Sequence, residues 1–211
     1  MNIFFLDKSP IKSAKMQCDK HVPKMCVETV QMLVSACRRR NWDEKYLPLT
    51  KSGTVHKGGY HNHPSTVWAG DCIDNFAWLL EHGLALTQEF KFRFGKKHAC
   101  REQLRTIARH TGLNEYGLWG PASLAEECHM TDVPLCIGEE LQAVHGMTAP
   151  LEDAVAIYRE FYMIDKADFA QWDKGRDAPE WWEVEHEISY AHRWEWTYSS
   201  HLGQAVIYQD C

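Results

Sequence analysis

The chain lacks a hydrophobic run long enough to cross a membrane, and it lacks any Cys-x-x-Cys pair. A bilayer-spanning helix needs about 20 consecutive apolar residues, and none of the 211 residues begins such a run. Eight cysteines without a paired spacing make a dense disulfide framework unexpected, so most should be reduced core thiols. Residues 1–6 are too few for a signal peptide. These absences predict a cytoplasmic protein with no membrane partner.

The sequence also lacks a complete set of metal ligands at metal-site spacing. His56, His61 and His63 surround two glycines in a loop that could wrap a metal. A fourth ligand is missing nearby, and no His-Glu-x-x-His helix occurs. We therefore interpret the segment as a loop that enters a helix at His63-Pro64, and we expect neither a metal nor another cofactor.

Strand-like alternation and internal repeats are missing as well, whereas helical spacing recurs. Apolar residues at this spacing predict a helix over residues 20–38, with Asp19 as its N-cap. A second, long helix is expected to begin at Ser65 or Thr66 and to reach Phe90. The class is therefore mainly helical.

The rest of the chain fits one helical domain with an extension. Further helices are expected at residues 99–110 and after Pro150, separated by a loop-rich segment at 111–149. We expect an all-α fold, with a compact domain over residues 1–187 and a C-terminal extension, residues 188–211, packed on it.

The net charge of −6 conceals a strong segregation. Residues 1–57 carry eleven Lys or Arg against five Asp or Glu, and residues 91–109 carry seven against one, whereas residues 110–187 carry four against seventeen. This asymmetry favours a long anion such as DNA as the partner. Around Arg93 and Lys96, basic residues alternate with aromatic residues, a pattern that is typical either of nucleic-acid contacts or of a helix end in the core.

The predicted helix at 20–38 gathers acid/base residues on one side. His21 and Glu28 are seven residues apart, about two turns, with Lys20 and Lys24 on or near the same face. This face is either an acid/base site or a solvated surface with a structural histidine. In the C-terminal third, Trp181 and Trp182 belong to an aromatic-rich stretch that could stack on a base or close a small core.

Several short motifs, in order along the chain, resemble the phage pyrimidine-dimer DNA glycosylase family and its wider relatives. They extend from residue 1 to about 182 and comprise Asp19-x-His21 then Glu28, His63-Pro64 with Trp68, Glu89-Phe90, Asp132-Val133-Pro134, Arg159, Lys166 and Pro179-Glu180-Trp181. The resemblance implies a compact all-α fold that kinks damaged DNA. It implies that an N-terminal amine attacks C1′ of the sugar beside a glutamate.

On this resemblance, Glu28 stabilises the developing sugar cation or protonates the opening sugar, and His21 orients or binds a phosphate. Trp181 and Trp182 correspond to a region near the lesion. The chain also departs from the family. Asn2 replaces the threonine whose free amine attacks, so Met1 is expected to be retained, and Val27 and Gln31 replace arginines. Lys20 or Lys24 could supply a replacement amine.

Three hypotheses follow from these residues. The first is a DNA glycosylase or lyase, acting in repair on a damaged or modified pyrimidine of DNA. The second is a phage transferase that attaches an amine or amino acid to an activated thymine, with Lys24, Glu28 and His21 activating the amine. The third is a non-catalytic binding protein. In the first two, Asn2, Lys20, Gln31 and His63 are candidate substrate contacts, together with Arg93, Lys96, Trp181 and Trp182.

Overall fold

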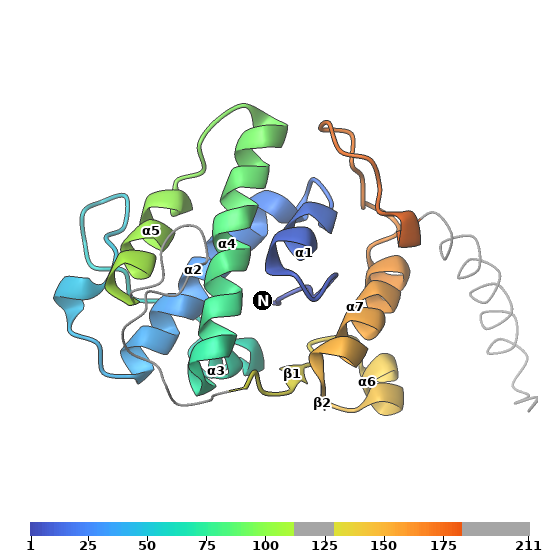
Figure 1. Ribbon diagram of the computed structural model, residues 1–211, viewed down its shortest axis with the longest axis horizontal. Coiled ribbons are helices and arrows are strands. Elements are labelled where there is room, and N and C mark those ends of the chain that lie inside the picture. The colour runs from blue at the N-terminus through green and yellow to red at the C-terminus, as the bar shows by residue number, and fades with distance from the viewer. Residues whose placement is uncertain (112–128, 183–211) are drawn as a thin grey trace, which may run out of the picture.

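The structure, a computed structural model, describes residues 1–111 and 129–182 (Figure 1). The predicted all-α class is confirmed, since the only sheet in this part of the chain is a two-stranded antiparallel pair, β1 with β2. The expected extension at residues 188–211 lies outside the described residues. The elements are α1 (Pro10–Met16), α2 (His21–Arg39), η1 (Glu44–Tyr46), α3 (Pro64–Asp71), α4 (Ile73–Phe94), α5 (Cys100–Thr111), β1 (Val133–Pro134), α6 (Glu139–His145), β2 (Thr148–Ala149) and α7 (Leu151–Asp165).

Helix α2 confirms the helix predicted at 20–38 but not its cap. Lys20 occupies the N-cap position and makes no side-chain cap bond. The carboxylate of Asp19 instead accepts hydrogen bonds from Arg93 Nη1 at 2.9 Å and from the backbone N–H of Lys174 at 3.1 Å. A charge-assisted bond to a buried guanidinium is stronger than a helix cap, so Asp19 is used in tertiary packing.

The long helix predicted from residue 65 to 90 is two helices. His63 caps α3 by accepting the N–H of Ser65, and Pro64 follows at the first position, which confirms the predicted helix entry. Cys72 is extended, with φ −144° and ψ 165°, and separates α3 from α4. The buried amide of Asn75 donates to the carbonyl of Trp68 at 2.8 Å and so stabilises this break.

The first residues of the chain lie in the core. Residues 3–6 are buried and pass through the centre of the molecule, near α4 and α7 (Figure 1). The ring of Phe4 contacts Tyr158 and Tyr162 of α7, and Phe5 contacts Trp68 and other rings. Burial of this segment fixes the position of the residues that precede it.

Residues 166–182 are joined to the helices by polar contacts, several of them partly buried. Trp172 Nε1 donates to the carbonyl of Met16, and the N–H of Asp19 donates to the carbonyl of Gln171. Arg176 donates to both carboxylate oxygens of Glu89, at 2.7 and 2.9 Å. None of the described helices combines the length and apolarity needed to span a bilayer.

Candidate active site at the start of the chain

Glu28 of α2 lies against the first residues of the chain. Its side chain is mostly buried, and Oε2 accepts the backbone N–H of Asn2 at 3.0 Å. The other oxygen, Oε1, is 3.5 Å from the ammonium of Lys24, one turn earlier on the helix. The carboxylate therefore has a backbone nitrogen on one side and a lysine amine on the other.

The side chain of Asn2 fixes the nitrogen that faces Glu28. Its amide donates to the carbonyl of Cys136 at 2.7 Å, and its Oδ1 accepts bonds from the hydroxyl of Tyr158 at 3.0 Å and the N–H of Ile3 at 2.8 Å. All three partners are held by the fold. Asn2 thus does not offer its amide to a substrate in this arrangement, but it positions the start of the chain.

Met1 and His63 complete this side of the site. The Thr66 hydroxyl donates to Met1 Sδ at 3.5 Å. Partial burial lowers the pKa of His63, the Met1 amino group lowers it further, and Glu28 opposes both effects. His63 is therefore within electrostatic reach of both the terminal amine and the Glu28 carboxylate.

His21 is buried and neutral. Tyr162 accepts the N–H of Cys18 at 3.0 Å, and its hydroxyl lies 2.6 Å from Nδ1 of His21. Burial raises the pKa of Tyr162 well above 10, so the phenol stays protonated and donates a hydrogen bond to Nδ1 of His21. The neutral ring then carries its own proton on Nε2, which has no hydrogen-bond partner among residues 1–111 and 129–182.

Three lysines surround His21 and create a cationic edge. Burial first, and then the ammonium groups of Lys166, Lys24 and Lys20, lower the pKa of His21 from 6.5 to about 3. Lys20 lies 4.3 Å from the centre of the Phe169 ring. Partial burial lowers the pKa of Lys166, and Lys24 lowers it further against the opposing effect of Asp165. Such an edge suits an anion.

Gln31 lies below a loop that borders the other end of the site. A Cβ atom added to Gly59 would be 3.3 Å from the Gln31 side chain, so the loop backbone sits directly on α2. Ser35, one turn further, donates to the carbonyl of Gly59 at 3.0 Å and accepts its N–H at 2.9 Å. Gln31 therefore supports the loop.

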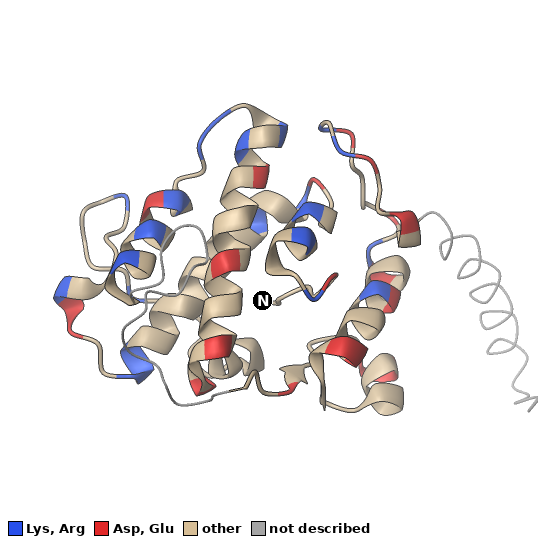
Figure 2. Ribbon diagram, in the orientation of Figure 1, with Lys and Arg blue, Asp and Glu red and all other residues tan. Residues whose placement is uncertain are grey.

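Arg93 and Lys96 are not brought to this site. The Arg93 side chain has 0% exposure, and its guanidinium donates to Glu89, to Asp19 and to two backbone carbonyls. Lys96 is exposed beyond the end of α4 and makes no contact with Glu28 within the described part of the chain. Basic residues predominate over α5 and the end of α4, and acidic ones occur on α6 and α7 (Figure 2).

Trp181 and Trp182 are 9% and 8% exposed and pack against the ring of Tyr162 at centroid distances of 6.2 and 6.3 Å. The guanidinium of Arg159 lies 5.5 Å from the Trp181 ring. In this structure the two indoles close a small core behind His21. The indole N–H of Trp181 is buried without a partner among the described residues.

Sequence patterns missed the groups that reach the site from elsewhere. Tyr158 and Tyr162 follow the helical spacing of core residues in α7, and both are buried, but no local signal reveals that their hydroxyls hold Asn2 and His21. The sequence likewise predicts Cys136 as a lone core thiol and does not show that its carbonyl accepts the Asn2 amide. Lys166 stood in the family motifs without an expected role, and its place beside His21 emerges only when α7 packs near α2.

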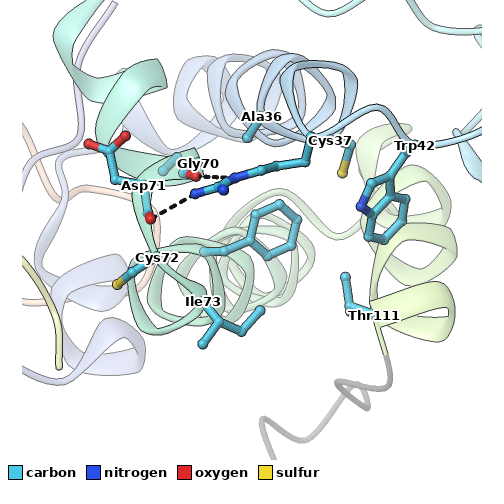
Figure 3. A pocket seen from close by; sticks show the side chains of 11 residues that line it. Ala36, Cys37, Trp42, Gly70, Asp71, Cys72, Ile73 and Thr111 are labelled. Atoms are coloured by element: carbon cyan, nitrogen blue, oxygen red, sulfur yellow. Dashed lines mark hydrogen bonds between the residues drawn. The ribbon is translucent and has the colours of Figure 1, made fainter. Parts of the chain in front are cut away.

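A separate cavity of about 360 Å³ lies between α2, α3, α4 and α5 (Figure 3). Its walls are largely apolar and include Trp42 and Phe76. The guanidinium of Arg40 donates to the carbonyls of Gly70 and Asp71, both at 2.8 Å. Glu28 does not line this cavity. Among residues 1–111 and 129–182, no group of three or more His, Cys, Asp or Glu could hold a metal ion.

Comparison with known proteins finds one similar family. No curated protein and no solved structure matches the chain. The model of one protein family, described as pyrimidine dimer DNA glycosylase, matches residues 1–102. This stretch contains Asn2, His21, Lys24, Glu28 and His63, and the description of the matched family points to an action on DNA. The similarity to the pyrimidine dimer DNA glycosylase family therefore extends over residues 1–102, slightly less than half of the chain.

Proposed function

We propose that the protein is a DNA glycosylase and lyase that acts on a damaged or modified pyrimidine in DNA. The observation that carries this proposal is the 3.0 Å distance between the backbone nitrogen of Asn2 and Oε2 of Glu28. A carboxylate beside the start of the chain is the arrangement that attack by a terminal amine requires. The family of residues 1–102 supports DNA as the substrate.

In the proposed reaction, the lone pair of the terminal amine attacks C1′ of the target nucleotide. The bond between C1′ and the base breaks, and the base leaves with the bonding electrons and takes up a proton. The sugar ring then opens, and loss of the second amine proton gives an imine between protein and DNA. Glu28 stabilises the positive charge that develops on the sugar or protonates the opening ring oxygen.

The cationic edge formed by Lys20, Lys24 and Lys166 provides the contact with the DNA backbone. A phosphate next to the target sugar would pair with these ammonium groups and accept a hydrogen bond from the Nε2–H of His21. Because His21 is neutral and its Nδ1 is occupied by Tyr162, it acts as a fixed donor. It does not act as a base.

The identity of the amine depends on Met1. Removal of Met1 turns the Asn2 nitrogen, already on Glu28, into the terminal amine. Retention of Met1 leaves an amide at that position and places the free amine close to His63. Lys24, whose ammonium is 3.5 Å from Glu28, is the third amine at the site.

The test is borohydride trapping on UV-irradiated duplex DNA, with unirradiated duplex as the control. We expect a covalent adduct and strand cleavage that depend on irradiation. Glu28→Gln keeps an oxygen that can accept the Asn2 N–H but removes the charge, so the adduct yield should fall by about 10²–10³-fold. Mass spectrometry of the intact protein and of the trapped peptide then identifies the amine as Met1, Asn2 or Lys24.

The control variant is Lys51→Gln, which removes an exposed lysine from the turn at residues 50–54 and should leave the adduct yield unchanged. Absence of any adduct and of any cleavage, on irradiated DNA and on modified phage DNA alike, would reject the glycosylase proposal. An adduct of unchanged yield in Glu28→Gln would reject the role of Glu28.

One observation favours a second function. With Met1 in place, the nitrogen that is hydrogen-bonded to Glu28 is an amide, which is not a nucleophile. The Lys24 ammonium lies beside Glu28, and an incoming amine would be positioned there by repulsion from Lys24 or by replacing it. A transferase that joins an amine or amino acid to an activated thymine would not need a nucleophile from the protein. This function predicts no adduct, an intact glycosidic bond and a gain in mass of the DNA base.

A further inference from the structure

We infer that Tyr60 is the residue that stacks on a nucleobase at this site, an inference that rests on the proposed function. Tyr60 lies in the loop between η1 and α3, and its carbonyl accepts the N–H of His63 at 2.9 Å. His63 is within electrostatic reach of Glu28. Tyr60 therefore stands on the rim of the site, one turn before the imidazole.

The loop holds Tyr60 in a fixed and unfavourable backbone conformation. Its φ is +53°, in the left-handed region that bulky residues rarely adopt. The preceding Gly58 and Gly59 lie so close to α2 that added Cβ atoms would contact Ser35 and Gln31 at 2.3 and 3.3 Å. The two hydrogen bonds between Ser35 and Gly59 lock this approach. Such strain is retained where surrounding contacts enforce it, often at functional sites.

The ring of Tyr60 is presented to solvent and not to the core. Tyr60 is 63% exposed, and within the described ranges its ring has no aromatic or cationic partner and its hydroxyl has no hydrogen bond. On α2, Val27, which precedes Glu28 in the sequence, is also exposed, at 43%. Apolar surface beside a catalytic carboxylate suits the flat face of a base.

The charge around the site indicates where the base would lie. Lys24 and Gln31 are seven residues apart on α2, about 10 Å along the helix axis. Lysines lie at one end of this interval and the Tyr60 loop at the other, with Glu28 between them. A strand whose phosphate meets the lysines and whose sugar meets Glu28 brings a base of the target step to the Tyr60 ring. Trp181 and Trp182 are packed behind His21, which leaves Tyr60 as the exposed aromatic residue of the described site.

The test compares duplexes with and without a thymine dimer, each carrying 2-aminopurine next to the target step. Tyr60→Asn removes the ring but keeps a residue that tolerates a left-handed backbone, so the loop should stay folded, as circular dichroism can verify. Tyr60→Phe retains the ring. Tyr46→Asn is the matched control, an exposed tyrosine of η1.

We expect wild type, Tyr60→Phe and Tyr46→Asn to bind the dimer duplex alike and to raise 2-aminopurine fluorescence. Tyr60→Asn should weaken binding to the dimer duplex about tenfold and reduce the fluorescence change, with undamaged duplex bound as before. Equal behaviour of Tyr60→Asn and wild type, or an equal loss on both duplexes, would overturn the role of Tyr60 while leaving the proposed function intact. If wild type shows neither dimer-dependent binding nor an adduct, the proposed function itself fails, and the inference fails with it.

Discussion

Arg93 Nη1 lies 2.9 Å from Oδ1 of Asp19 and joins the end of α4 to the residue that precedes α2. The same guanidinium donates to Glu89 at 2.8 Å, and Glu89 also pairs with Arg176. Burial alone would raise the pKa of Glu89, but the hydrogen bonds from Arg176 and Arg93 lower it overall. This cluster fixes the position of the start of α2, and therefore the positions of His21 and Glu28 on that helix.

Arg93→Met should destabilise the fold strongly. The substitution leaves Asp19 without its buried cation and Glu89 with Arg176 alone, which should lower the free energy of unfolding by about 3 kcal/mol. Urea denaturation measures this change. Lys96→Met, at an exposed position three residues further along, should change the same quantity by less than about 0.5 kcal/mol. Equal effects of the two substitutions would show that the Arg93 cluster contributes nothing to stability.

Stability should fall in mild acid because two histidines are buried in the neutral form. Burial lowers the pKa values of His21 and His82 from 6.5 to about 3. Between these values the unfolded chain binds protons that the folded chain does not, so this contribution to stability is complete above pH 6.5 and is lost as the pH falls. Each histidine should contribute a slope of about 1.4 kcal/mol per pH unit.

The check is the free energy of unfolding measured by urea at several pH values between 6.5 and about 5. His82→Leu removes one of the two groups and should reduce the slope by about one proton. A wild-type stability that is constant over this range would contradict neutral burial of both rings.

Gly58→Ala should detach the loop that carries Tyr60. An added Cβ would lie 2.3 Å from Ser35 Oγ, and φ at Gly58 is +79°, so both the backbone and the Ser35 hydrogen bonds are disturbed. We expect a loss of about 2–3 kcal/mol in the free energy of unfolding. Gly53→Ala is a matched control, because its φ is +80° but no atom lies within 4 Å of the added Cβ. It should cost about 1 kcal/mol, and an equal loss in both variants would deny the contact with Ser35.

Lys20→Ala should reduce the salt dependence of DNA binding. If Lys20 contacts one phosphate, the slope of log K against log salt concentration should become less steep by about 0.9, as should that of Lys166→Ala. Fluorescence anisotropy of a labelled duplex at several salt concentrations provides the slopes. Lys51→Ala, outside the site, should retain the wild-type slope, and a wild-type slope in Lys20→Ala would place the DNA elsewhere.

Much of the helical fold was predictable because apolar spacing and breakers are local signals. The helix predicted at 20–38 is His21–Arg39, and the one predicted at 99–110 is Cys100–Thr111. The break at Cys72 was missed because it depends on the amide of Asn75 reaching Trp68 and Thr131. Helix α6 was missed because its segment is rich in loop-forming residues.

The sequence alone determined that Glu28, His21 and Lys24 share one helix, since a 3.6-residue period fixes which positions lie near each other. It could not show that His21 and Glu28 are buried, because the same spacing describes a solvated face. Tertiary structure decided that Arg93 is enclosed, that Tyr162 fixes the His21 tautomer and that the Asn2 nitrogen faces Glu28. These contacts join residues separated by 26 to 141 positions, and such pairs form only when packing of the whole chain outweighs the entropy of closing the intervening loops.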